Sequence, residues 1–101
     1  MKAVKIEDHS VTEIEVENTL EALQEQVNGY IEAVTLIPDK VTMLINEEGL
    51  IKNMATNLAA TIVAGIDIVG PAIVVGVNGD EFTDVPAEVA QRIITRFGGK
   101  K

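Results

Sequence analysis

The sequence predicts a single α+β domain over residues 1–101, with one mainly antiparallel sheet of about five strands, two main helices and a short third helix. Two segments near the N-terminus alternate polar and apolar residues, the period of a half-buried strand. Two other segments repeat apolar residues at helical spacing. A chain of 101 residues can enclose one hydrophobic core but not two. We therefore expect one sheet with the helices packed on one of its faces.

The first predicted element is an antiparallel hairpin. Residues 2–7 and 11–17 each alternate along the chain, and the polar turn Asp8-His9-Ser10 separates them. The side chains expected to point inward are Val4, Ile6, Ile14 and Val16.

A helix of about three turns should follow the hairpin. Asn18 is suited to the N-cap and Glu21 stands three residues later, as in a capping box. The apolar stripe consists of Leu20, Leu23 and Val27. Asn28-Gly29 then supplies a C-terminal stop.

A second hairpin is predicted from residues 30–37 and 41–46, which flank the turn Pro38-Asp39-Lys40. Both segments are rich in β-branched residues and are apolar on both faces. Strands of that kind are buried on both sides, so we expect both to lie centrally in the sheet.

The stretch from Leu58 to Val77 has only one charged residue, Asp67, and is long enough to cross a bilayer as a helix. Glycines and Pro71 interrupt it, and Asp67 would lie at mid-depth. We therefore predict a short helix over residues 57–63, a turn and a buried strand over residues 72–77. The N-terminus has no apolar stretch of signal-peptide length, so we expect a cytoplasmic protein with no membrane partner.

The last predicted element is a helix that begins at Pro86, with Asp84 as its cap, and ends at Gly98-Gly99. Its apolar stripe consists of Val85, Val89, Ile93, Ile94 and Phe97.

Composition excludes several classes of function. The absence of cysteine removes disulfides, thiolate zinc sites and a Cys nucleophile, and a single histidine removes multi-histidine metal sites within one chain. Asp8, His9 and Ser10 are adjacent and cannot converge as a catalytic triad. An enzyme would have to use Asp67 or Glu47 with water. We therefore expect no enzyme, no metal and no cofactor.

The net charge of −8 disfavours direct binding of nucleic acid, because an acidic surface repels phosphates. The acidic residues are concentrated in the first half of the chain. Glu13, Glu15 and Glu17 recur at every second residue, so they would lie about 7 Å apart along one strand face.

A set of polar residues at element boundaries is the predicted ligand site. Its members are Asn46, Glu47, Asn57, Thr61 and Asp67. If they converge at one end of the sheet, they could bind a hydrogen-bonding ligand. The alternative is that they cap one another and stabilise an irregular loop. Because basic residues are few, phosphate contacts would need Arg92, Arg96, Lys52 or the N-termini of helices.

The second half of the chain carries an ordered set of residues, namely Asn46-Glu47-Glu48-Gly49, Asn57, Ala60-Thr61, Asp67, Gly70-Pro71, Gly76 and Thr83-Asp84-Val85-Pro86. With the upstream hairpin and helix, the set resembles a small domain-of-unknown-function family encoded by bacteriophages, notably those of actinobacteria, and by mobile elements. Leu58 stands where some members of that family have arginine. The resemblance implies origin and size but no reaction.

Two functional hypotheses follow. The first is a phage-encoded, non-enzymatic binding protein that sequesters a host nucleotide immune signal in the host cytoplasm, in a pocket between protomers, by analogy with other small phage proteins. The second is an inhibitor that binds a host DNA-binding protein through acidic residues that imitate DNA phosphates. A homo-oligomer is expected in either case, because the apolar stretch 62–77 exceeds what a small core would bury.

Overall fold

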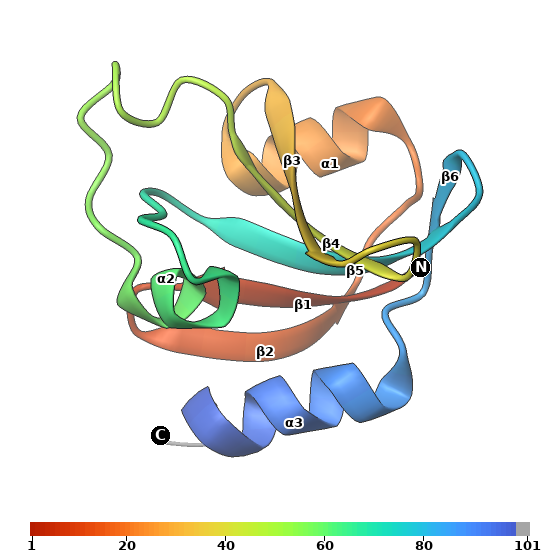
Figure 1. Cartoon of the computed structure of the whole chain (residues 1–101). Helices are drawn as coiled ribbons and strands as arrows, with labels where there is room; N and C mark the ends of the chain where they lie inside the picture. The colour runs from red at the N-terminus through yellow and green to blue at the C-terminus, as the bar shows by residue number, and fades with distance from the viewer. Residues whose placement is uncertain (99–101) are drawn as a thin grey trace.

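The computed structural model describes residues 1–98 and confirms the α+β class, with one antiparallel sheet and three helices (Figure 1). The elements in chain order are β1 (Lys2–Glu7), β2 (Ser10–Glu15), α1 (Leu20–Val27), β3 (Ile31–Ile37), β4 (Val41–Asn46), α2 (Leu58–Ala64), β5 (Ala72–Asn78), β6 (Glu81–Thr83) and α3 (Ala87–Phe97).

The strand order is β2-β1-β5-β4-β3, and every pairing is antiparallel. The short strand β6 pairs with β5 outside this path and was not predicted, since three residues give too weak a periodic signal. The turn that joins the two strands lies at Gly79-Asp80. Gly76 of β5 has no room for a side chain, because a Cβ there would meet the backbone carbonyl of Asp84.

The helices cover both faces of the sheet, so the prediction that they lie on one face is wrong. Buried residues of α2 and α3 pack with one face, and Leu23 of α1 packs with the other (Figure 1). The central strands explain the difference. In β4 and β5 consecutive residues are buried, which requires cover on both sides.

The prediction that both strands of the second hairpin are central is correct for β4 and wrong for β3. β4 pairs with β3 on one side and β5 on the other, whereas β3 ends the strand order. Glu32, Ala33, Thr35 and Ile37 of β3 are exposed. The composition of β3 is that of a buried strand, but its position is that of an edge.

Two of the predicted helix caps are wrong, and each side chain has another partner. Thr19, not Asn18, caps α1 by accepting a hydrogen bond from the backbone N–H of Ala22 at 3.2 Å. Asn18 donates instead to the carbonyl of Phe82 at 2.8 Å. Leu20, predicted to belong to the apolar stripe, is 57% exposed because it precedes the turn of α1 that contacts the sheet.

Asp84 does not cap α3; it accepts from the backbone N–H of Lys2 at 2.8 Å and ties the start of β1 to the end of β6. Pro86 is the N-cap residue of α3 and makes no side-chain hydrogen bond. The end of α3 at Gly98 agrees with the prediction, and Gly99 lies outside the described residues.

The apolar stretch from Leu58 to Val77 folds as predicted, into a short helix, a turn and a buried strand. None of the helices within residues 1–98 is long and apolar enough to cross a membrane.

Candidate functional site

Asn46 lies at the end of β4 and is 3% exposed. Its Nδ2 donates to the carbonyls of Val27 at 2.9 Å and Asn28 at 3.1 Å, and its Oδ1 accepts from the N–H of Glu48 at 2.7 Å. These bonds satisfy the last carbonyls of α1 and fix that helix against the sheet.

Asn57 fixes the start of α2, as Asn46 fixes the end of α1. Its Oδ1 accepts from the N–H of Ala60 at 3.2 Å, as an N-cap does. Its Nδ2 donates to the carbonyls of Ile6 at 2.9 Å and Gly70 at 2.8 Å. The side chain is 2% exposed and joins α2, β1 and the start of β5. It borders a hollow of about 370 Å³ that also touches Met54.

The other three predicted residues of the loop set differ in burial. The Oγ1 of half-buried Thr61 accepts from the N–H of Ile68 at 2.9 Å and lies 3.3 Å from the carbonyl of the same residue. Glu47 and Asp67 are exposed. The side chains of Asn46, Asn57 and Thr61 thus hydrogen-bond to backbone groups of other segments.

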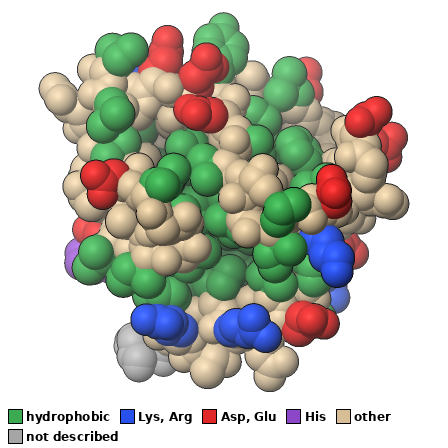
Figure 2. Space-filling view, in the orientation of Figure 1, with side chains coloured by type: hydrophobic (Ala, Val, Ile, Leu, Met, Phe, Trp, Pro, Cys, Tyr) green, Lys and Arg blue, Asp and Glu red, His purple; other side chains and the backbone are tan. Residues whose placement is uncertain are grey.

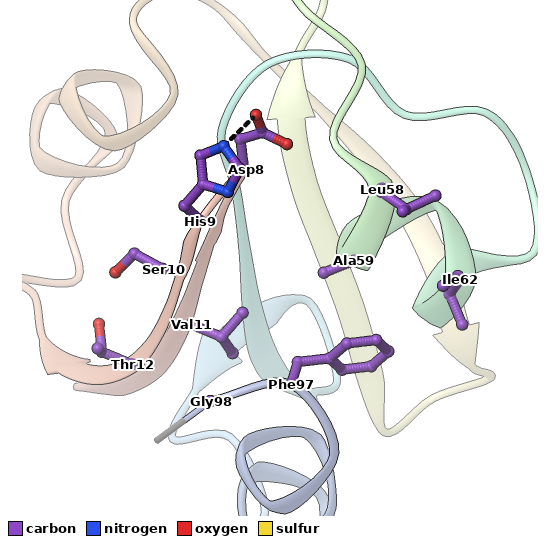
Figure 3. Close-up of a pocket in the computed structure, with 10 residues that line it drawn as sticks. All are labelled: Asp8, His9, Ser10, Val11, Thr12, Leu58, Ala59, Ile62, Phe97 and Gly98. Atoms are coloured by element: carbon purple, nitrogen blue, oxygen red, sulfur yellow. Dashed lines mark ion pairs between the residues drawn. The ribbon is translucent and has the colours of Figure 1, made fainter. Parts of the chain in front are cut away.

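A cleft of about 760 Å³ lies between the β1–β2 hairpin, α2 and the end of α3 (Figure 3). Its apolar lining comes from Val11 of β2, from Phe97 of α3 and from α2 residues Leu58, Ala59 and Ile62. The Phe97 ring points from α3 toward α2 (Figure 3).

The polar lining of the cleft comes from the hairpin: Asp8, His9, Ser10 and Thr12. His9 Nε2 lies 3.2 Å from Asp8 Oδ2, and the His9 side chain is 93% exposed. The Asp8 side chain beside it is 55% exposed. The cleft therefore combines an apolar interior with hydrogen-bonding groups along one side.

The predicted arginines both lie on α3. Arg92 and Arg96 are exposed and line a shallow hollow along the helix. The Arg96 guanidinium carbon lies 5.4 Å from the centroid of the Phe97 ring, a cation–π distance. Figure 2 shows Lys and Arg side chains along the lower edge of a face whose centre is hydrophobic. Since Phe97 lines the cleft, Arg96 places a positive charge beside it.

The sequence-based reasoning missed the cleft residues Leu58, Ile62 and Phe97. Leu58 and Ile62 are four residues apart and 62% and 48% exposed, so they form an apolar stripe on the outer side of α2. The spacing was visible in the sequence, but it is equally consistent with a core-facing stripe. Within residues 1–98 no group of three or more His, Cys, Asp or Glu side chains could hold a metal ion.

Comparison with known proteins adds one match. A family model described as "Domain of unknown function (DUF3846)" matches residues 1–98. No curated protein and no solved structure matches the chain.

Proposed function

We propose a binding function for this chain, which belongs to the family described as Domain of unknown function (DUF3846). The protein acts without catalysis, as a phage- or mobile-element-encoded protein that holds a nucleotide in the cleft between the β1–β2 hairpin, α2 and α3. The observation that carries the proposal is the combination of an apolar cleft of about 760 Å³ with a guanidinium beside its aromatic wall.

The parts of a nucleotide match the parts of this cleft. A flat base suits the space bounded by Phe97, Leu58 and Ile62, where stacking and apolar contact need no charge. The hydroxyls of Ser10 and Thr12 can donate to or accept from the base and ribose. Phosphate oxygens would then face outward, toward Arg96 and, one turn earlier on α3, Arg92.

Asp8 limits how much negative charge the cleft tolerates. Its carboxylate lines the cleft and lies beside His9. Because like charges at short range oppose binding, a ligand with one or two phosphodiester charges fits better than a triphosphate. Cyclic mono- and dinucleotides have that charge, and they serve as immune signals in bacteria. A protein that binds such a signal stoichiometrically lowers its free concentration in the host cytoplasm.

The test is isothermal titration against a panel of cyclic mono- and dinucleotides. We expect saturable binding to at least one member, at least tenfold weaker binding with Leu58→Glu, and weaker binding with Arg96→Gln. Leu50→Glu is the matched control for the first variant, because Leu50 is 79% exposed and lies outside the cleft. Lys40→Gln, in the β3–β4 turn, is the control for the second. A flat response across the panel would remove the proposal.

One observation favours the second candidate function, mimicry of DNA. Glu13 and Glu15 of β2 are exposed, and Glu17, two residues beyond the end of the strand, is exposed too. Host-lysate pull-down at low and high salt tests this function. Phosphate mimicry predicts capture of DNA-binding proteins at low salt, loss of capture at high salt, and loss of capture with Glu13→Gln combined with Glu15→Gln. Capture that persists in high salt would contradict mimicry.

A further inference from the structure

β3 is an edge strand with the sequence of an interior one. Its seven residues, Ile-Glu-Ala-Val-Thr-Leu-Ile, include one charge, Glu32, and no proline or lysine. Edge strands of monomeric proteins usually carry charged residues, especially lysine, or proline. Without these residues, the unpaired backbone N–H and C=O groups of the edge can pair with another chain. At the opposite edge, β2 has two glutamates in six residues.

Every second residue of β3 directs its backbone N–H and C=O groups away from β4. The carbonyl of Tyr30 accepts from the N–H of Glu47 at 2.9 Å, so this pair is a hydrogen-bonded one. In an antiparallel ladder such pairs alternate, so the backbone groups of Glu32 and Val34 also point toward β4. The N–H and C=O groups of Ile31, Ala33 and Thr35 therefore point outward, and no strand within residues 1–98 pairs with them.

A register shift between Thr35 and Ile37 interrupts the ladder near the turn. The regular part of the edge is thus Ile31–Thr35, and its centre is Ala33. A second copy approaching antiparallel across a two-fold axis at Ala33 would pair Ala33 with its own equivalent. It would also pair Ile31 with Thr35 of the second copy, and all three outward-pointing residues would be hydrogen-bonded.

The side chains suit this self-pairing. Glu32 would stand opposite the uncharged Val34 of the second copy, so the only charges of the two strands would not face each other. Ala33 is small and exposed, which allows close approach at the axis. Tyr30, 66% exposed, would lie opposite Leu36 of the second copy, a half-buried residue.

We propose that two copies of this chain associate through β3, with the two-fold axis at Ala33, to form one continuous antiparallel sheet. The inference is independent of the proposed ligand. The net charge of −8 on each copy opposes association, and salt screens that repulsion. The dimer is therefore expected to strengthen as ionic strength rises, the opposite of what an ion-paired interface would do.

The first test is sedimentation velocity of the full chain over a range of concentrations at low and high salt. We expect a monomer–dimer equilibrium that salt shifts toward the dimer, and a shift to monomer with Ala33→Lys, which places like charges across the axis. Ala87→Lys, the same substitution at the exposed first residue of α3, is the matched control and should dimerise as the wild type does. Circular dichroism checks that both variants fold. A wild type that stays monomeric at its highest soluble concentration, or an Ala33→Lys variant that still dimerises, overturns the proposal.

The second test fixes the register. The chain has no cysteine, so each single-cysteine variant reports one position. Ala33→Cys should form a disulfide-linked dimer under mild oxidation, because Cα atoms of a hydrogen-bonded pair are about 5.5 Å apart, within disulfide range. Thr35→Cys should not, because the two Thr35 residues would be offset by four residues, about 13 Å. A dimer that cross-links through Thr35→Cys and not through Ala33→Cys overturns the assigned axis.

Discussion

The two edges of the sheet differ in how they meet solvent. β2 carries Glu13 and Glu15, and α3 packs closely beside it. β3 also contacts helices, α1 and α2, but it carries one charge and leaves Ala33, Thr35 and Ile37 exposed. Charged edge residues oppose pairing with another chain, whereas uncharged ones permit it. The contrast indicates that the β2 edge is closed to pairing with another chain, whereas the β3 edge is available for it.

The two halves of the sheet are also held differently. On the β2 side, Asn57 joins α2 to the backbone of Ile6 and Gly70, which are 51 and 13 residues away in sequence. On the β3 side, Asn46 joins β4 to the last carbonyls of α1. Each half therefore depends on one buried amide, and substitution of each measures how firmly that half is fixed.

The largest expected effect is that of Asn57→Ala. The substitution leaves the carbonyls of Ile6 and Gly70 without their partner and removes the cap of α2, all within a region that is almost fully buried. Unsatisfied buried polar groups cost about 1–3 kcal/mol each, so the free energy of unfolding should fall by roughly 3 kcal/mol. Urea denaturation followed by circular dichroism measures it.

Asn18→Ala is the matched control for that variant. Asn18 makes a single exposed hydrogen bond, to the carbonyl of Phe82, so its removal should cost about 0.5 kcal/mol. Equal losses in the two asparagine variants would show that Asn57 does not fix its half of the sheet.

Asn46→Ala should have the next largest effect, about 2 kcal/mol. It removes two donated bonds and one accepted bond, but only one of these three bonds is buried, whereas two of the three that Asn57 makes are buried. Amide hydrogen exchange should show faster exchange in α1, β3 and β4 than in β1 and β2. Uniformly faster exchange would mean that the two halves open together.

Much of the fold could be predicted from local patterns. The end of α1 at Asn28, with φ of +64°, follows from a side chain that favours this conformation. The apolar stretch from Leu58 to Val77 was correctly divided, because its glycines and Pro71 interrupt a continuous helix. These features depend on residues close together in the sequence.

The errors concern residues whose partners lie far away in the sequence. Asn18 pairs with the carbonyl of Phe82 and Asp84 with the N–H of Lys2, contacts that no local pattern indicates. Periodicity marks a strand as apolar on both faces but does not give its place in the sheet, and so β3 was predicted to be central. The cleft was missed for the same reason, since it combines β2, α2 and α3.

A smaller effect is expected at the start of α1, in the half of the sheet that Asn46 fixes. Thr19→Ala removes the hydrogen bond to the N–H of Ala22 and should lower the free energy of unfolding by about 1 kcal/mol. Thermal and urea denaturation of Thr19→Ala and Asn18→Ala, measured side by side, distinguish the observed cap, Thr19, from the predicted cap, Asn18. If Asn18→Ala cost more than Thr19→Ala, the cap would be Asn18 in solution.

The smallest change in stability, and the most direct test of the contrast between the edges, comes from Glu13→Thr combined with Glu15→Thr. Both glutamates are exposed, and the contact of Glu15 with the N-terminal ammonium is long, at 3.4 Å, so the free energy of unfolding should change by less than about 0.5 kcal/mol. The double substitution also removes the charge on the edge of β2, and threonine favours strands.

The association experiment combines these two substitutions with Ala33→Lys, which closes the β3 edge. We expect this triple variant to regain concentration-dependent association in sedimentation velocity, now through β2. If this triple variant stays monomeric, charge alone does not keep β2 closed, and the neighbouring α3 must obstruct that edge.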